Sequence, residues 1–317
     1  MKLADLKFTE IDITSPIENC RIRGLEGHSN MDMIPVPSEL ADDIEVLKAK
    51  VDQKRDNARG ATDFPLQYGE LIFRVALIPD INGEIYSLRK IETQRIDTRA
   101  CGLNPKIRDV IMARRSGLII VSGPFRSGKT TLASAIIREW LEANGGKAIT
   151  LEDPPEALLS GQHGEAGICY QVMIDRRYIE EEIEKHARST YDMLFIGEIR
   201  GPRMAAAATV NSANGRLILA TYHADSVQDT LTRWLTDTAH EIDKGEARNL
   251  LSRSLAAVLH MATRDGKPPM LDRFLLPDYG EGVRGRIKSG EVPTLENDVQ
   301  RQRQLMVMGK LIPKTGT

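Results

Sequence analysis

The chain has 317 residues, with 43 lysines and arginines against 45 aspartates and glutamates, for a formal net charge of −2. That length is enough for two domains of ordinary size. The near balance of charge argues against a generic nucleic-acid binder, which needs a basic surplus to neutralise phosphates. Three widely spaced cysteines, Cys20, Cys101 and Cys169, form no CxxC pair, so they indicate reduced thiols rather than a zinc site or a disulfide framework.

No segment of the sequence has the features of a membrane anchor. The first residues lack the apolar stretch of a signal peptide, and the best apolar run, residues 117–121, is too short to cross a bilayer. We therefore expect a soluble, cytoplasmic protein without a transmembrane segment, whose contact with a membrane depends on partners.

The first hundred residues predict a small α+β domain. Ile11–Thr14 alternates with the period of a strand, and residues 38–57 form a polar stretch that favours a helix. Two further strands, Glu70–Ile78 and Glu84–Ile91, are joined through Asn82-Gly83, a pair that favours a tight hairpin turn.

The pattern changes at the hinge-like stretch Gly102–Pro105, where we place a boundary between domains at 1–103 and 104–317. Continuous apolar runs then alternate with helical segments, which is typical of an α/β fold with a parallel sheet covered on both faces. From about residue 226 to 317 the sequence reads as mostly helical, including Gly245–Met261, where apolar residues recur at helical spacing. The apolar runs are Leu118–Val121, Ala148–Leu151, Met193–Ile196 and Leu217–Thr221.

A glycine-rich loop stands between the first of these runs and the helix that follows it. In such a loop, successive backbone N–H groups and the helix N-terminus surround phosphates. Lys129 supplies a cation for the β- and γ-phosphates, and the Thr130 hydroxyl can join the shell of Mg²⁺. The motif therefore predicts binding of ATP with Mg²⁺. Its residues, which match G-x-x-x-x-G-K-[ST] with one threonine added, are Gly123, Pro124, Phe125, Arg126, Ser127, Gly128, Lys129, Thr130 and Thr131.

Polar residues follow three later strands at their carboxyl ends, where ligands of a parallel sheet bind. They lie in residues 149–156 (ITLEDPPE), 193–200 (MLFIGEIR) and 217–226 (LILATYHADS). With the glycine-rich loop, in this order and spacing, they resemble the secretion ATPase superfamily, which drives type II secretion, type IV secretion and type IV pili. There the four segments are Walker A, the Asp box, Walker B and the His box. The resemblance runs from about Glu70 to the C-terminus and implies a RecA-like P-loop core after a small PAS-like domain.

The resemblance implies roles for three side chains. Glu152 would orient or deprotonate the attacking water, Glu198 would support Mg²⁺ and water, and His223 would contact the γ-phosphate. Water attack on the γ-phosphoryl group requires such positioning and a proton acceptor. Taken alone, Glu152 reads equally well as an exposed carboxylate at a strand end, and His223 as a structural histidine.

Four arginines are further candidates. Arg74 and Arg89, in the first domain, match positions where the family carries arginines that reach an ATP, although strand arginines also form ordinary ion pairs. Arg200 follows the Walker B glutamate and either reaches the ATP or orients Glu198. Arg126 stands where the family commonly has glycine, and it puts a bulky cation near the phosphates.

The resemblance implies a Mg-dependent ATPase that works as a homo-oligomer, expected to be a hexamer, at the cytoplasmic side of the inner membrane. Because the tetracysteine insert of assembly-type members is missing, the sequence looks closer to PilT-like retraction ATPases and to those of Dot/Icm and conjugative type IVB systems. An inner-membrane platform is the implied partner, and no direct nucleic-acid binding is expected.

Two other functions stay open. One is a RecA-like DNA translocase or helicase, against which the acidic balance and the few aromatic residues for base stacking argue. The other is a nucleotide-gated assembly scaffold with little turnover, against which the acidic segments argue.

Overall fold

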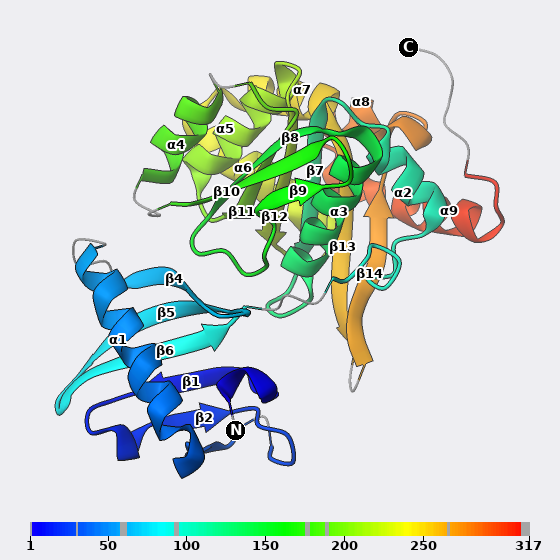
Figure 1. The fold of residues 1–317 in the computed structure, drawn as a ribbon. Helices are drawn as coiled ribbons and strands as arrows, with labels where there is room; N and C mark the ends of the chain where they lie inside the picture. The colour runs from blue at the N-terminus through cyan, green and yellow to red at the C-terminus, as the bar shows by residue number, and fades with distance from the viewer. Residues whose placement is uncertain are drawn as a thin grey trace. The chain divides into compact units, whose positions relative to one another are not determined.

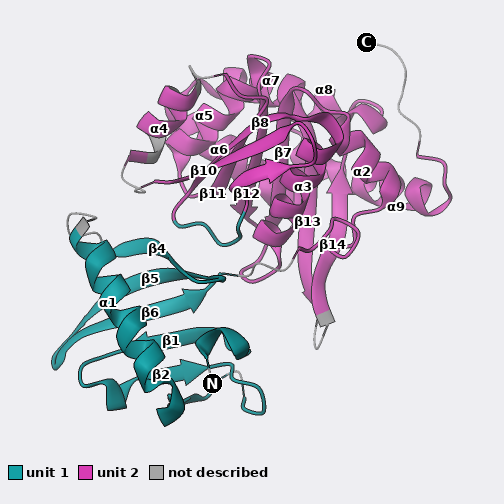
Figure 2. Ribbon diagram, in the orientation of Figure 1, with its two compact units in different colours: residues 1–94, 154–158 teal, residues 95–153, 159–317 magenta. Residues whose placement is uncertain are grey.

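The computed structural model describes residues 2–29, 31–57, 62–91, 95–174, 178–187, 190–264 and 267–311. The chain divides into two units, each with its own core (Figure 2). The first unit comprises residues 1–94 and 154–158, and the second comprises residues 95–153 and 159–317.

The first unit is an antiparallel sheet with a long helix, α1 (Ala41–Asn57), on one face (Figure 1). The expected strand near residue 11, the helix after residue 38 and the hairpin are confirmed, the last with Asp80 paired to Gly83. The six strands, in the sheet order β3-β2-β1-β6-β5-β4, are β1 (Glu10–Ile13), β2 (Arg21–Arg23), β3 (Met33–Pro35), β4 (Asp63–Tyr68), β5 (Leu71–Asp80) and β6 (Gly83–Lys90).

Alternation along the strands decides which face of this sheet is covered. Successive side chains of a strand point to opposite faces, and every second residue is buried along residues 71–75 of β5 and 86–88 of β6, in the core that includes α1. The residues between them lie on the other face. The buried members are Leu71, Phe73 and Val75 of β5, Tyr86 and Leu88 of β6, and Ile44, Leu47 and Val51 of α1.

The second unit is an eight-stranded sheet in the order β14-β13-β7-β12-β11-β8-β10-β9. The six strands from β13 to β10 run parallel, and β14 and β9 are antiparallel to their neighbours. The strands are β7 (Gly117–Gly123), β8 (Gly146–Glu152), β9 (Gly161–His163), β10 (Gly167–Met173), β11 (Met193–Ile199), β12 (Leu217–His223), β13 (Leu255–Arg264) and β14 (Lys267–Leu275).

Helices cover both faces of this sheet (Figure 1). Helices α2 (Pro105–Met112) and α3 (Lys129–Asn144) share one buried apolar layer, and α5 (Pro202–Ala213) and α6 (Val227–Glu241) belong to the other. The predicted α/β fold, with a parallel sheet covered on both faces and a small α+β unit before it, is confirmed. Of the helices in the described parts of the chain, none combines the length and apolarity that crossing a membrane requires. The remaining helices are α4 (Ile179–Ala187), α7 (Lys244–Ser254), α8 (Val283–Ser289) and α9 (Glu296–Val307).

The prediction of a helix over Gly245–Met261 is wrong in its second half. Helix α7 ends at Ser254, and Leu255 begins β13, which runs parallel beside β7. Leu255–Met261 is buried at every position. A strand covered on both faces loses the alternation of a half-exposed strand, and periodicity alone cannot separate such a run from a buried helix. Residues 226–317 are therefore a mixture of helices with β13 and β14.

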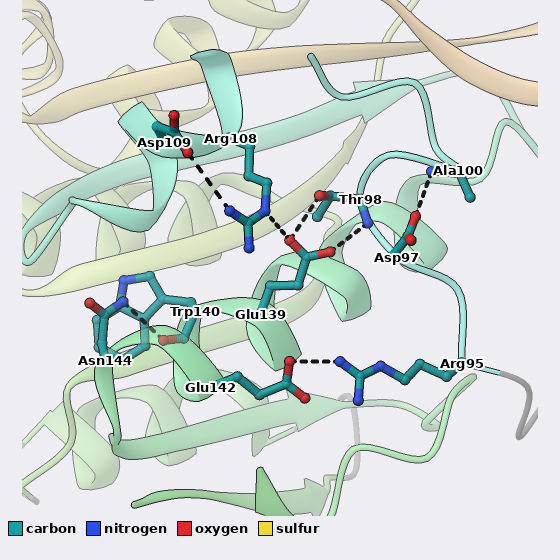
Figure 3. Close-up of polar contacts among 10 residues, drawn as sticks. All are labelled: Arg95, Asp97, Thr98, Ala100, Arg108, Asp109, Glu139, Trp140, Glu142 and Asn144. Carbon is teal, nitrogen blue, oxygen red and sulfur yellow. Dashed lines mark hydrogen bonds and ion pairs between the residues drawn. The ribbon is translucent and has the colours of Figure 1, made fainter. Parts of the chain in front are cut away.

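A buried glutamate of α3 holds the start of the second unit. Glu139 accepts hydrogen bonds from the backbone N and the Oγ1 of Thr98, at 2.7 and 2.9 Å, and from Nε of Arg108, at 2.5 Å (Figure 3). One turn further along α3, Glu142 pairs with Arg95 at 2.6 Å between Oε2 and Nη2. Hydrogen bonds to a charged group are the strong ones, so residues 95–98 are fastened to the helix that follows the glycine-rich loop.

The Gly102–Pro105 stretch, expected as a hinge, is packed into the second unit as well. Cys101 and Leu103 are buried, and the backbone N of Leu271 donates to the Cys101 carbonyl oxygen at 2.8 Å. Asn104 caps helix α2 by accepting a hydrogen bond from the N of residue 106. The division between the units accordingly falls between residues 94 and 95, before this stretch.

Candidate nucleotide-binding site

The glycine-rich loop connects buried strand β7 to helix α3, as the sequence predicts. A Cβ at Gly123 would lie 2.5 Å from both the Met261 carbonyl oxygen and the Ser127 hydroxyl oxygen, so only glycine fits there. Gly128, at the N-cap of α3, has a φ of 79°, which glycine adopts without strain. The loop thus lies at the carboxyl end of β7 and before a helix N-terminus, where phosphate is favoured.

Two polar side chains of the loop stand out. Lys129 Nζ donates to the carbonyl oxygens of Gly123 and Pro124, at 3.0 and 2.8 Å, which holds the ammonium group over the loop. Ser127 Oγ is fully buried and has no hydrogen-bond partner among the described residues. Since buried polar atoms are nearly always paired, this orphaned hydroxyl suits a loop that receives a polar ligand.

The neighbouring strands bring the other candidate residues to the same edge of the sheet. Strand β12 lies next to β7 and ends in His223, which is opposite Gly123 in the register. Strands β11 and β8 follow, with Glu198 and Glu152 at or near their carboxyl ends. Because adjacent strands lie about 4.8 Å apart, β8 is roughly 14 Å from β7. His223 is therefore closest to the loop in strand order, and Glu152 is farthest.

Glu152 is a buried carboxylate, only 3% exposed, and not the exposed strand-end residue that the sequence left open. Its Oε1 accepts hydrogen bonds from Thr150 Oγ1 at 2.6 Å and Gln171 Nε2 at 2.8 Å. Gly197 of β11 packs on it, because a Cβ there would approach Glu152 Cγ to 3.0 Å. Burial, and then the charge of Glu152, raises the pKa of Cys169 to about 12, so this thiol stays neutral. The surroundings fix the carboxylate in one orientation.

Glu198 is half-buried on β11 and forms an ion pair with Arg200, whose Nε and Nη2 both contact its Oε2. This contact is the one expected if Arg200 orients Glu198. Thr221 Oγ1 of β12 donates to the Gly197 carbonyl oxygen, which fixes the backbone beside the glutamate.

The oxygen donors near the loop suit a magnesium ion that arrives with phosphate. Mg²⁺ keeps several waters and takes one or two protein ligands together with phosphate oxygens. Thr130, half-buried in the first turn of α3, and the Glu198 carboxylate are ligands of this kind. Across the described ranges, no group of three or more His, Cys, Asp or Glu side chains could hold a metal ion by itself. The residues present fit Mg²⁺ bound with a nucleotide rather than a metal cage.

His223 is exposed at the end of β12. Its carbonyl oxygen accepts a hydrogen bond from Arg233 Nη1 at 2.9 Å, but its ring has no such bond to any residue that the structure describes. The ring of His223 is therefore accessible from solvent at the same sheet edge as the glycine-rich loop.

Arg74 and Arg89 lie directly opposite each other in the β5–β6 register of the first unit, on the face away from α1. Arg74 Nη2 is 3.5 Å from Asp63 Oδ1, and its buried Nε has no partner among the described residues. Like charges opposite one another in a sheet are destabilising. Glu10 of β1, opposite Arg89 on its other side, and the long contact of Arg74 to Asp63 offset part of this repulsion.

Comparison with known proteins decides the family. The model of the type II/IV secretion system protein family matches residues 40–265. The chain belongs to this family. The predicted resemblance to secretion ATPases is thereby confirmed, and the four segments of the family lie along one edge of the sheet.

The curated proteins that this chain matches include much longer ones. The type II secretion system protein E of Pseudomonas aeruginosa is 29% identical over 219 residues, which are 68% of this chain and 41% of that protein. The protein of the same name from Dickeya dadantii is 33% identical over 192 residues, or 59% and 36% of the two chains. The chain spans about two fifths of the length of the curated relatives it matches.

Two solved structures of pilus and secretion proteins have the same fold. The pilus retraction motor PilT with bound ADP aligns with a TM-score of 0.73 and 22% identity, covering 96% of this chain and 87% of that one. The ATPase DotB of Legionella pneumophila aligns with a TM-score of 0.70 and 17% identity, covering 97% and 89%. Both alignments extend over the two units.

His260, to which the sequence gave no role, belongs to a buried polar chain beside the loop. It lies on β13 opposite Ser122, the residue before Gly123, and the two contact each other at 3.2 Å between Nδ1 and Oγ. Thr230 Oγ1 of α6 contacts Ser122 Oγ at 2.8 Å and the Ser226 carbonyl oxygen at 2.6 Å. The carbonyl only accepts, so Thr230 donates to it, Ser122 donates to Thr230, and the His260 Nδ1–H donates to Ser122.

This chain of hydrogen bonds links the P-loop strand to the loop after His223. Burial lowers the pKa of His260, which favours the neutral ring at pH 7, and the bond to Ser122 places the proton of that ring on Nδ1. The only sequence signal was a pair of polar residues, Ser122 and His260, inside otherwise apolar strand runs.

Proposed function

We propose that this protein hydrolyses ATP and thereby drives a secretion or pilus machine. The observation that carries the proposal is the single sheet edge that joins the P-loop, His223, Glu198 and Glu152 in a member of the type II/IV secretion family. A ligand of a parallel sheet binds at that edge.

In the proposed reaction, backbone N–H groups of residues 123–131 and the Lys129 ammonium hold the phosphates. Thr130 and Glu198 would hold Mg²⁺, which would neutralise charge on the phosphate oxygens. Glu152 accepts a proton from the attacking water, whose oxygen bonds to the γ-phosphorus as the bond to the bridging oxygen breaks and ADP leaves. His223, exposed beside Gly123, contacts the γ-phosphate.

Arg74 and Arg89 of the first domain are further catalytic candidates. We assign them to the phosphates because the two guanidinium groups lie opposite each other and the buried Nε of Arg74 has no partner among the described residues. In this proposal the chain works within a homo-oligomeric ring of six, and hydrolysis drives a conformational change around the ring. ATPase activity per chain should rise with chain concentration as rings form, and full activity in a dilute monomer would remove the ring from the proposal.

The machine we favour is a conjugative or other type IV secretion system, or a type IV pilus. The absence of a tetracysteine zinc insert from the sequence supports these over a type II system. The chain would work at the cytoplasmic face of the inner membrane, bound to a membrane platform. Pull-down with the platform proteins encoded beside its gene tests this, and capture of only a type II platform would contradict it.

Phosphate release from Mg-ATP, measured with and without DNA, separates the proposal from its alternatives. A motor of this family should hydrolyse ATP at a rate that DNA leaves unchanged. Strong stimulation by DNA would favour a translocase instead, and tight ATP binding without turnover would favour a nucleotide-gated scaffold.

A further inference from the structure

The P-loop contains a residue whose backbone conformation is unfavourable for its type. The N of Ser127 donates to the Pro124 carbonyl oxygen at 3.3 Å, which closes a turn with Phe125 and Arg126 at its centre. Arg126 has a φ of 59° and is the only residue other than glycine with a positive φ in the described parts of the chain. The third position of such a turn favours glycine when φ is positive, and a side chain there costs free energy.

Despite this backbone cost, the position carries arginine, whose side chain is an exposed cation of the P-loop. Arg126 is exposed, and its guanidinium carbon lies 5.6 Å from the ring centroid of Phe125, which is itself 75% exposed. Across the residues that the structure describes, Arg126 forms no ion pair. Lys129, in contrast, already donates to two carbonyl oxygens of the loop. A strained residue in a functional loop is a reason to look for a function.

We propose that Arg126 is a catalytic residue that stabilises the transition state of ATP hydrolysis from within the chain's own P-loop. This inference rests on the proposed ATPase function and adds a residue to it. As the water oxygen bonds to the γ-phosphorus and the bond to the bridging oxygen breaks, negative charge shifts onto the bridging and γ-phosphoryl oxygens. The guanidinium contacts those oxygens, and its planar fork can donate to two of them at once.

The position of Arg126 separates its role from those of the other cations. Lys129, three residues later, is a point charge bound to the Gly123 and Pro124 carbonyl oxygens, whereas Arg126 lies in the turn with its guanidinium over the Phe125 ring. Arg74 and Arg89 belong to the other unit. Arg126 belongs to the P-loop itself, so it is available at the phosphates of every chain.

The test uses Arg126→Gly, which removes the charge and relieves the backbone at once. We expect its thermal midpoint to equal or exceed that of the wild type, while kcat falls by about 10²-fold or more, as on loss of a preorganised donor to the transition state. Affinity for ADP with aluminium fluoride, a transition-state mimic, should fall by a similar factor, whereas affinity for ADP alone should stay nearly unchanged. Arg126→Lys keeps the positive charge but lacks the planar guanidinium. Its kcat and its affinity for ADP with aluminium fluoride should lie between those of the wild type and of Arg126→Gly.

Arg303→Gln on α9 is the matched control, because it removes one exposed arginine of the same unit far along the chain, and it should leave every value unchanged. Arg126→Gly with wild-type turnover would overturn this inference and leave the proposed function intact. Equal losses of affinity for ADP and for the fluoride complex would also overturn it, since they would assign Arg126 to ground-state binding. A wild-type chain that neither hydrolyses ATP nor binds the mimic would remove the proposed function and this inference together.

Discussion

Replacing Glu152 with glutamine should abolish catalysis and leave the fold intact. Oε1 of Glu152 accepts hydrogen bonds from Thr150 and Gln171 inside a buried pocket. The amide oxygen of glutamine can accept both, so the loss of stability should stay below about 1 kcal/mol. An alanine would strand both donors and cost about 1–3 kcal/mol for each, which would confuse folding with chemistry. Glutamine is therefore the informative change.

The expected loss of activity is far larger than that structural cost. Glutamine cannot take the proton of the attacking water, and general-base catalysis contributes about 10²–10⁴-fold. This corresponds to about 3–5 kcal/mol in activation free energy. Phosphate release gives kcat, a labelled ATP analogue gives affinity, and a melting curve gives stability; only kcat should change.

Glu165→Gln is the control for this variant, because it removes the same charge at an exposed position just before β10, at the opposite edge of the sheet. It should match the wild type in all three measurements. If Glu152→Gln retains most of its turnover, the carboxylate does not act as the base. If its melting temperature falls strongly, the buried surroundings of Glu152 require the negative charge of this side chain for stability.

Three more predictions follow from the site. Lys129→Ala should weaken binding of a labelled ATP analogue, and unchanged affinity would remove the P-loop assignment. Arg74→Ala and Arg89→Ala should each lower kcat while light scattering shows the same assembly as the wild type; a smaller particle would instead assign the residue to assembly. His260 has a pKa lowered from 6.5 by burial, so the unfolded chain binds more protons and stability falls as pH drops from about 6.5 toward that lower value. His260→Asn keeps a donor near Nδ1 and should flatten this part of the stability curve, whereas an equal slope would show that other groups cause it.

Features that local chemistry dictates could be predicted from the sequence, for a physical reason. Binding phosphate at a helix N-terminus requires glycines at fixed spacing and a lysine next to the last one, so the P-loop can be read without structure. The hairpin could likewise be predicted because Asn82-Gly83 favours a two-residue turn. In both cases a local rule dictates the local structure.

Features that depend on contacts distant in sequence could not be predicted in this way. The run after Ser254 becomes strand β13 because β7 and β14 lie beside it, and nothing within the run itself requires that. Glu139 fastens Thr98, a residue 41 positions away, and neither belongs to a motif. The burial of Glu152 arises from packing against Gly197 of another strand, so its sequence alone allowed an exposed carboxylate.

The most direct test of the central claim compares phosphate release from Mg-ATP by the wild-type chain and by Lys129→Ala. The two are purified in parallel and assayed at the same concentration, with and without chelation of Mg²⁺. We predict turnover by the wild type that depends on Mg²⁺ and that Lys129→Ala lacks. Equal release by the two proteins would contradict the assignment of ATP hydrolysis to this P-loop.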